Sequence, residues 1–128
     1  MGDCQGAIAD YTKAIEISPQ FALAYTNRGV AKYDLEDYQG AIVDHTKAIE
    51  INPQSALAYT NRGLAKDGLG DQQGSIADYT KAIEINPQSA RAYYNRGNAK
   101  SDLKDYQGAI ADYTKAIEIS PQFALAYT

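Results

Sequence analysis

Three asparagines recur at a fixed interval of 34 residues and are the side chains best suited to binding: Asn27, Asn61 and Asn95. A side-chain amide has a carbonyl acceptor and an NH₂ donor, so it can pair with both polar groups of one extended peptide unit. Such pairing recognises peptide backbone rather than a particular sequence. We therefore predict that the three asparagines hold an extended peptide. The alternative is that asparagine is simply tolerated at this position.

The other chemistry-bearing residues do not form a catalytic or metal-binding set. The single histidine, His45, replaces the tyrosine that the other copies have at Tyr11, Tyr79 and Tyr113, which indicates a packing position. The carboxylates recur at capping or solvated places, and no two stand apart from the repeat as a general acid and base. A metal site would need several histidines or cysteines, and the chain has one of each. We expect no enzymatic activity, no metal and no cofactor.

The asparagines belong to a repeated unit of two helical segments. The stretch that begins at Ala7 returns at Ala41, Ser75 and Ala109, each time 34 residues later. Its apolar residues follow the spacing i, i+1, i+4, i+7 and i+8, which forms one stripe along a helix. The stretch that carries the asparagines has a helical pattern of its own. Each unit is therefore predicted to be a two-helix hairpin, and a period of this length is typical of a stacked array.

The spacing of the aromatic, glycine, alanine and proline residues resembles that of the tetratricopeptide repeat. The residues that carry the resemblance are Tyr25, Gly29, Ala41 and Pro53, then Tyr59, Gly63, Ser75 and Pro87, then Tyr93, Gly97, Ala109 and Pro121. Two departures recur, with Arg28, Arg62 and Arg96 where the family usually has leucine, and Lys32, Lys66 and Lys100 where it often has tyrosine. They define an Asn-Arg-Gly variety of the repeat. The resemblance implies an all-α fold, a right-handed superhelical solenoid of antiparallel helical hairpins.

We expect a single array over residues 1–128. Residues 1–21 are interpreted as the second helix of a truncated repeat, 22–55, 56–89 and 90–123 as complete repeats, and 124–128 as the start of a further one. Asp3 is the expected N-cap of the first helix. Ser18 is the expected N-cap of the second, with Pro19 at its first helical position, where no backbone donor is needed.

The expected binding surface is the concave face lined by the first helix of each hairpin. Its candidate residues are Thr26, Asn27, Val30, Tyr33, Thr60, Asn61, Leu64, Arg91, Tyr94, Asn95 and Asn98. The resemblance implies peptide binding, because other members of the family hold peptides with asparagines at this place in the repeat. Members that clamp a C-terminal carboxylate need lysine and asparagine where this chain has Thr26 and Val30, so such a clamp is not expected. Aspartates towards the helix ends favour a neutral or basic peptide.

Arginines and aspartates at a constant separation predict an internal ion pair in each hairpin. Arg28, Arg62 and Arg96 each precede an aspartate by 16 residues, at Asp44, Asp78 and Asp112. A turn near the midpoint brings the two members to similar heights on neighbouring helices. The alternative, in which the arginines reach into the groove for a ligand carboxylate, is less favoured because they share the stripe of Tyr25 and Gly29.

The composition excludes several classes of partner. The formal charge of −4 and the absence of a lysine and arginine cluster argue against nucleic acid and anionic membrane surfaces. No apolar run approaches the ~20 residues that a membrane-spanning helix needs. We therefore expect a cytoplasmic protein whose partner is a protein or peptide.

A second hypothesis is a structural array that associates with itself. The segment from Gln5 to Thr26 is identical to that from Gln107 to Thr128, so few positions of the repeat are left to be specialised for one ligand. Both ends of the sequence cut through a hairpin, so an apolar helix face would be open at each end. This hypothesis predicts a homo-oligomer formed head to tail.

Overall fold

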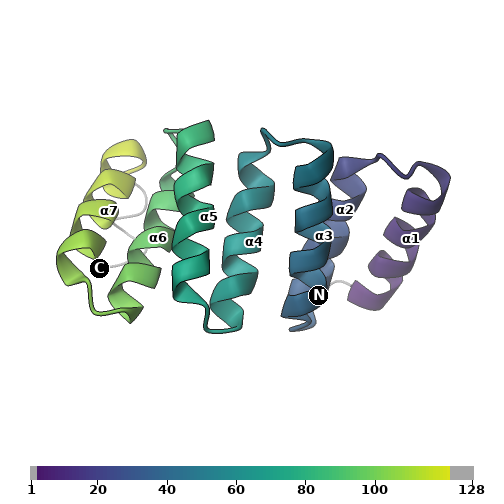
Figure 1. Cartoon of the computed structure of the whole chain (residues 1–128), viewed down its shortest axis with the longest axis horizontal. Helices are drawn as coiled ribbons and strands as arrows, with labels where there is room; N and C mark the ends of the chain where they lie inside the picture. Colours follow the sequence, from purple (N-terminus) through teal and green to yellow (C-terminus); the bar gives the residue numbers. More distant parts are fainter. Residues whose placement is uncertain (1–2, 122–128) are drawn as a thin grey trace.

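Residues 3–121 are described by the computed structural model, and this range is helical with no strand. Its seven helices are α1 Cys4–Ile17, α2 Ala22–Asp34, α3 Tyr38–Ile51, α4 Ala56–Gly68, α5 Gln72–Ile85, α6 Ala90–Asp102 and α7 Tyr106–Ile119 (Figure 1). The predicted all-α array of hairpins is confirmed. Residues 1–2 and 122–128 lie outside the described range, and with them the expected start of a further repeat at 124–128.

The odd-numbered helices begin at the aspartates that precede them. The carboxylate of Asp3 accepts a hydrogen bond from the backbone N–H of Gly6 at 3.0 Å, and Asp71 accepts one from Gly74 at 2.9 Å. The same contact starts α3 and α7. Because the first N–H groups of a helix have no partner within the helix, such a side-chain acceptor fixes its start. Asp3 is therefore the N-cap that the sequence predicts.

The predicted start of α2 is wrong by several residues. Ser18 ends α1, where its N–H donates to the carbonyl of Ala14 at 2.8 Å, and Phe21 occupies the N-cap position of α2. A residue before proline avoids the helical region, so Ser18 is kept out of a continuing helix and the chain turns instead. The N–H of Phe21 closes this turn on the Ser18 carbonyl at 3.0 Å.

The helices form two layers with different spacing. Each helix packs on its neighbours in sequence, α2 also contacts α4, and α4 also contacts α6. Among the described helices, no odd-numbered one contacts another odd-numbered one. The even-numbered helices are therefore closer together and line the inside of the curve, while α1, α3, α5 and α7 lie outside (Figure 1).

Small residues let the two layers approach closely. The fully buried core consists largely of alanines, and its largest members are Tyr79 and His45. In the structure, a Cβ atom added at Gly29, Gly63 or Gly97 would meet the ring of His45, Tyr79 or Tyr113 in the same hairpin. The Gly63 carbonyl also accepts a hydrogen bond from the hydroxyl of Ser75 at 2.8 Å. A Cβ atom added at Gly63 would lie 2.5 Å from Cε1 of Tyr79.

The predicted ion pairs are confirmed, and they are larger networks than predicted. Arg28 donates to both carboxylate oxygens of Asp44 at 2.8 and 2.7 Å, and Lys32 lies 3.1 Å from the same carboxylate. Arg28 also donates to the hydroxyl of Thr12, which belongs to the preceding hairpin. The same arrangement recurs around Asp78 and Asp112. These arginines therefore tie adjacent hairpins together instead of reaching into the groove.

Candidate functional site

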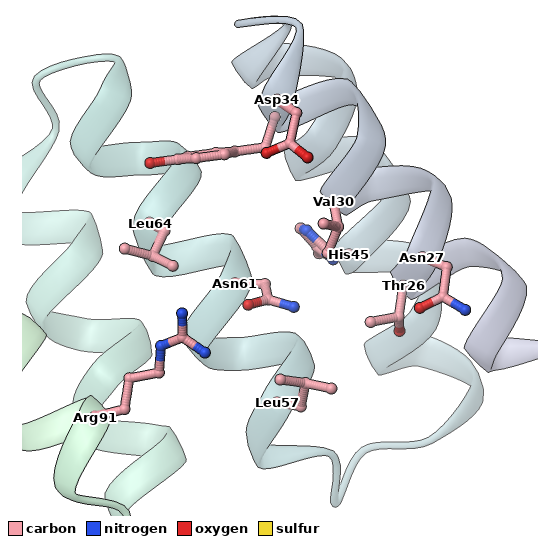
Figure 2. Close-up of a pocket in the computed structure, with 10 residues that line it drawn as sticks. Thr26, Asn27, Val30, Asp34, His45, Leu57, Asn61, Leu64 and Arg91 are labelled. Atoms are coloured by element: carbon pink, nitrogen blue, oxygen red, sulfur yellow. The ribbon is translucent and has the colours of Figure 1, made fainter. Parts of the chain in front are cut away.

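Helices α2 and α4 place Asn27 and Asn61 on the two sides of one cavity. Both side chains are half-buried, and the cavity between them has a volume of about 300 Å³. Figure 2 shows the Asn61 amide in the middle of the site, with Thr26 and Asn27 on the opposite wall. The two asparagines stand one repeat apart, and each can offer its donor and acceptor to a bound chain.

Apolar side chains supply most of the cavity wall between the asparagines. Val30 comes from α2, and Leu57 and Leu64 come from α4 (Figure 2). Leu57 was not predicted, although it lies four residues before Asn61 and therefore on the same face of α4. Apolar walls with a few placed polar groups are typical of a binding site.

Charges of opposite sign lie at the two ends of the cavity. Asp34 stands at the end of α2, and the Arg91 guanidinium reaches in from α6 on the other side (Figure 2). Both residues are exposed. The basic side chains Arg28 and Lys32 of α2 are instead paired with Asp44. A ligand lying along the cavity would thus meet a carboxylate at one end and a guanidinium at the other.

Two of the predicted site residues use their polar groups internally. The hydroxyl of Thr26 donates to the carbonyl of Ala22 at 3.2 Å, and that of Thr60 donates to the carbonyl of Ala56 at 3.0 Å. Both threonines are buried. Thr26 lines the cavity, whereas Thr60 does not. What Thr26 can offer a ligand is mainly its methyl group, since its hydroxyl proton is engaged.

The predicted residues of α6 lie apart from the cavity, with the exception of Arg91. Asn98 accepts a hydrogen bond from the hydroxyl of Tyr113 at 2.5 Å, and the rings of Tyr94 and Tyr113 have centroids 5.6 Å apart. Asn95 is 8% exposed, and its amide nitrogen has no hydrogen-bond partner within the described structure. The structure thus gathers Thr26, Asn27, Val30, Tyr33, Asn61, Leu64 and Arg91 around one cavity, and leaves Thr60, Tyr94, Asn95 and Asn98 outside it.

His45 is a cavity residue that the sequence interpretation assigned only to packing. It is 1% exposed, and its imidazole packs against Gly29. The pKa of His45 is lowered to about 4, chiefly by burial, while the Asp44 carboxylate acts to raise it and the nearby Arg62 charge acts to lower it. The imidazole is therefore neutral at pH 7, with one nitrogen as donor and the other as acceptor. The replacement of tyrosine by histidine was the visible signal, since it shortens the side chain at the floor of the cavity.

A second hollow, of about 210 Å³, lies on the other side of α2. It is lined by Asp3, Cys4, Ala7, Tyr11, Asn27, Val30, Ala31 and Asp34. Asn27 thus lies on the ridge between two hollows, so its amide can be reached from either side.

Neither a metal centre nor a membrane segment emerges from residues 3–121. No group of three or more histidine, cysteine, aspartate or glutamate side chains is placed to hold a metal ion there. In the same range, no helix has the length and apolar character needed to cross a bilayer.

Comparison with known families identifies the repeat. A family model described as "Tetratricopeptide repeat" matches residues 22–55 and 90–123, and one described as "TPR repeat" matches residues 1–36 and 68–104. The chain belongs to the tetratricopeptide repeat family. The resemblance noted in the sequence is thereby confirmed. No curated protein matches the chain at a significant level.

Solved tetratricopeptide repeat structures superpose closely on this chain. One described as "Crystal structure of MamA" has a TM-score of 0.88 and 31% identity, and covers 96% of this chain and 72% of its own. The Arabidopsis OM64 TPR domain has a TM-score of 0.78 and 33% identity, and covers 79% and 84%. The first TPR of Spaghetti (RPAP3), bound to the HSP90 peptide SRMEEVD, has a TM-score of 0.78 and 28% identity, and covers 80% and 81%.

The tetratricopeptide fold explains where a ligand can approach. Proteins of this family are generally interaction scaffolds without enzymatic activity, and one of the three relatives above was solved with a peptide bound. In this chain, the arginine networks and the alanine core fill the space between the layers. The open cavity of α2 and α4 remains on the inner face, with Asn27 and Asn61 in its lining.

Proposed function

We propose that the inner face formed by α2, α4 and α6 binds an extended segment of another protein and performs no chemistry on it. The observation that carries this proposal is the pair of amides, Asn27 and Asn61, on facing sides of a partly apolar cavity. Each amide can satisfy the carbonyl and the N–H of a peptide unit, while Val30 and Leu64 provide apolar contact. Extended peptides have unpaired backbone groups, so this surface suits them.

The absence of catalysis belongs to the same proposal. His45, the one histidine of the sequence, is buried and held neutral, and its neighbours at the cavity are mainly apolar or amide side chains. A general acid and base would need two titrating groups with pKa values near the working pH. The cavity residues do not supply such a pair.

The test replaces the amides and measures peptide binding. A peptide array first selects segments that bind the unaltered chain, and affinities are then measured for Asn27→Ala combined with Asn61→Ala, and for Asn95→Ala alone. The double variant should bind about tenfold more weakly or worse, because each lost hydrogen bond contributes about 0.5 to 1.5 kcal/mol. Its circular dichroism should keep the full helical signal.

Asn86 provides the matched control. It is an exposed asparagine in the turn after α5, so Asn86→Ala makes the same chemical change away from the inner face. It should leave peptide affinity unchanged. Undiminished binding by the double variant would reject the proposed role of the asparagines.

We also propose that the ligand is neutral or basic. Asp34 and Asp102 are exposed at the ends of α2 and α6, while Arg91 is the exposed cation that lines the cavity. A peptide series of graded charge should therefore bind more tightly as positive charge is added. The acidic peptide SRMEEVD, bound by the RPAP3 relative, serves as the negative comparator. Tighter binding of that acidic peptide would overturn the charge preference.

The alternative function is self-association of the array. Ile110 is 63% exposed on α7, whereas the equivalent Ile42 and Ile76 of the earlier hairpins are half-buried. A second copy could cover this face head to tail. Light scattering over a concentration series tests the alternative, since it requires the mass to increase with concentration and Ile110→Lys to reduce that increase.

A further inference from the structure

The hairpin of α2 and α3 differs from the two that follow it at one inward-facing position. Where α5 and α7 have Tyr79 and Tyr113, α3 has His45. All three rings pack on the glycine of their own hairpin, so the imidazole occupies the base of the site that a tyrosine ring fills elsewhere. A phenol ring extends farther from the backbone than an imidazole does. The replacement therefore removes the outer part of this side chain from the α2 and α3 hairpin.

The two tyrosine hydroxyls have internal partners that His45 lacks. Tyr79 donates to the carboxylate of Asp67 at 2.6 Å, and Tyr113 donates to the amide oxygen of Asn98 at 2.5 Å. The residues of α2 at the positions of Asp67 and Asn98 are Tyr33 and Val30.

The imidazole of His45 forms no hydrogen bond within residues 3–121, and its Nδ1 atom is buried without a partner. Leaving a buried polar atom unpaired costs about 1 to 3 kcal/mol, so a hydrogen-bond partner for the imidazole would be favoured. Because His45 is 1% exposed, a partner that enters the cavity reaches the imidazole only as the side chains around it shift. In the neighbouring hairpins, the corresponding polar group is satisfied within the fold.

The cavity adjoins the side chain that is shorter in this hairpin and that has no internal hydrogen-bond partner. His45 forms part of its wall, together with Val30, Leu57 and Leu64 (Figure 2). Its volume of about 300 Å³ is at the lower end of the range for ligand pockets, which suits one large side chain better than a whole cofactor. Asp34 and Arg91 stand at the two ends of the cavity, whereas Val30, Leu57 and Leu64 line it together with the uncharged imidazole. A charged side chain seated among these apolar residues would lose its hydration without an opposite charge beside it.

We propose that this cavity takes a tyrosine side chain of the bound partner, with its ring between Val30 and Leu64 and its hydroxyl hydrogen-bonded to the imidazole of His45. The proposal rests on the proposed function and names the side chain that the inner face selects. A phenol hydroxyl can donate to or accept from an imidazole in either tautomer. Phenylalanine or leucine would fill the cavity but leave the imidazole without a hydrogen-bond partner. Serine would leave most of the cavity empty. The partner's tyrosine would thus restore the phenol that this hairpin lacks.

The direct test uses p-cresol, the side-chain analogue of tyrosine, with toluene as the analogue without a hydroxyl. His45 is the one histidine of the sequence, so the ¹⁵N signals of the imidazole in the labelled protein can be assigned without ambiguity. We expect p-cresol to shift these signals saturably. Its affinity should be at least about fivefold higher than that of toluene. Equal affinity for the two probes, or no saturable shift with p-cresol, would overturn the proposal.

A filled-cavity variant tests the same site without relying on the imidazole. Combining Val30→Asn with His45→Tyr rebuilds the pair that Asn98 and Tyr113 form in the α6 and α7 hairpin, so the variant has a native precedent for its packing. It should unfold at a temperature no lower than the unaltered chain and no longer bind p-cresol, as followed by the Asn27 and Asn61 side-chain amide signals. Tyr113→His makes the reverse change in another hairpin and should leave p-cresol binding at His45 intact.

Peptides separate this proposal from the proposed function. Among array peptides that bind, changing the tyrosine to phenylalanine should weaken binding about tenfold to the unaltered chain, but should have little effect on binding to the filled-cavity variant. If peptides bind both proteins equally and tolerate phenylalanine, the tyrosine site is refuted while peptide binding by the inner face stands. If the unaltered chain binds no peptide at all, the proposed function itself fails, and the p-cresol titration still reports separately on the cavity.

Discussion

Arg62 and Asp78 face one another across the α4 and α5 hairpin with two parallel hydrogen bonds, Nε to Oδ2 at 2.9 Å and Nη2 to Oδ1 at 2.8 Å. Lys66 lies 3.1 Å from the same carboxylate, and Arg62 also donates to Thr46 of the preceding hairpin at 3.2 Å. One carboxylate therefore pairs with two cations, and one guanidinium joins two repeats. The Arg62 guanidinium also stacks over the Tyr59 ring at 5.4 Å from its centroid.

Removing Asp78 should therefore destabilise the protein more than removing Arg62. Asp78→Ala leaves two half-buried cations without their anion, with an expected cost of about 3 to 5 kcal/mol, whereas Arg62→Ala leaves Asp78 paired with Lys66 and should cost less. In a double-mutant cycle measured by denaturant unfolding, the double variant should cost less than the sum of the single variants by about 0.5 to 3 kcal/mol. Strictly additive costs would show that the pair is not coupled.

Acid should weaken the protein through His45. Burial lowers its folded-state pKa to about 4, from the ordinary value of 6.5, so between these values the unfolded chain binds the proton more readily. Stability from this group is complete above pH 6.5 and falls as the pH decreases towards 4, by about 2 to 3 kcal/mol in total.

Carboxylates also titrate between pH 4 and pH 6.5, so the pH dependence of one protein does not report on His45 alone. Asp67, for example, has a pKa raised by its burial, which acts in the opposite sense. Comparing the unaltered protein with His45→Tyr isolates the contribution of the imidazole. The difference in unfolding free energy between the two proteins should change by about 2 to 3 kcal/mol between pH 7.5 and pH 4.5. A difference that is constant with pH would contradict a buried, neutral His45.

Gly63 should not tolerate even a methyl group. The Cβ atom of Gly63→Ala would lie 2.5 Å from a ring carbon of Tyr79, whose side chain is fully buried and hydrogen-bonded to Asp67. Overpacking of this kind costs about 1 to 3 kcal/mol, which exceeds the ~1 kcal/mol that alanine gains over glycine in a helix.

Gly74→Ala, in the same hairpin, is the matched control for that substitution. Its Cβ atom would meet the end of the Asp71 side chain, which can rotate away but then loses its cap hydrogen bond from the Gly74 N–H. That loss costs about 1 kcal/mol, and the helix propensity of alanine should offset most of it. Thermal unfolding of the two variants should rank Gly63→Ala clearly below Gly74→Ala. Equal stabilities would show that the glycine is not required for ring packing.

The sequence by itself determined the architecture, because its information is local and repeated. The 34-residue period, the helical stripes and the aspartates at the starts of the odd-numbered helices each depend on near neighbours in the chain. The pairing of Arg62 with Asp78 also follows from hairpin geometry alone. The start of α2 was misplaced because Ser18 and Pro19 combine two helix-start signals with a turn, and only the hydrogen bond from Phe21 to Ser18 decides between them.

The tertiary structure alone decided which residues form the site. Thr26 and Thr60 occupy equivalent positions in α2 and α4, yet of the two only Thr26 borders the cavity. Whether the polar tip at position 45, 79 or 113 is satisfied depends on a residue of the other helix of its hairpin. A cavity is a difference between the volumes of side chains that meet in space, so the substitution at His45 acquired meaning only after its neighbours from α2 and α4 were placed around it.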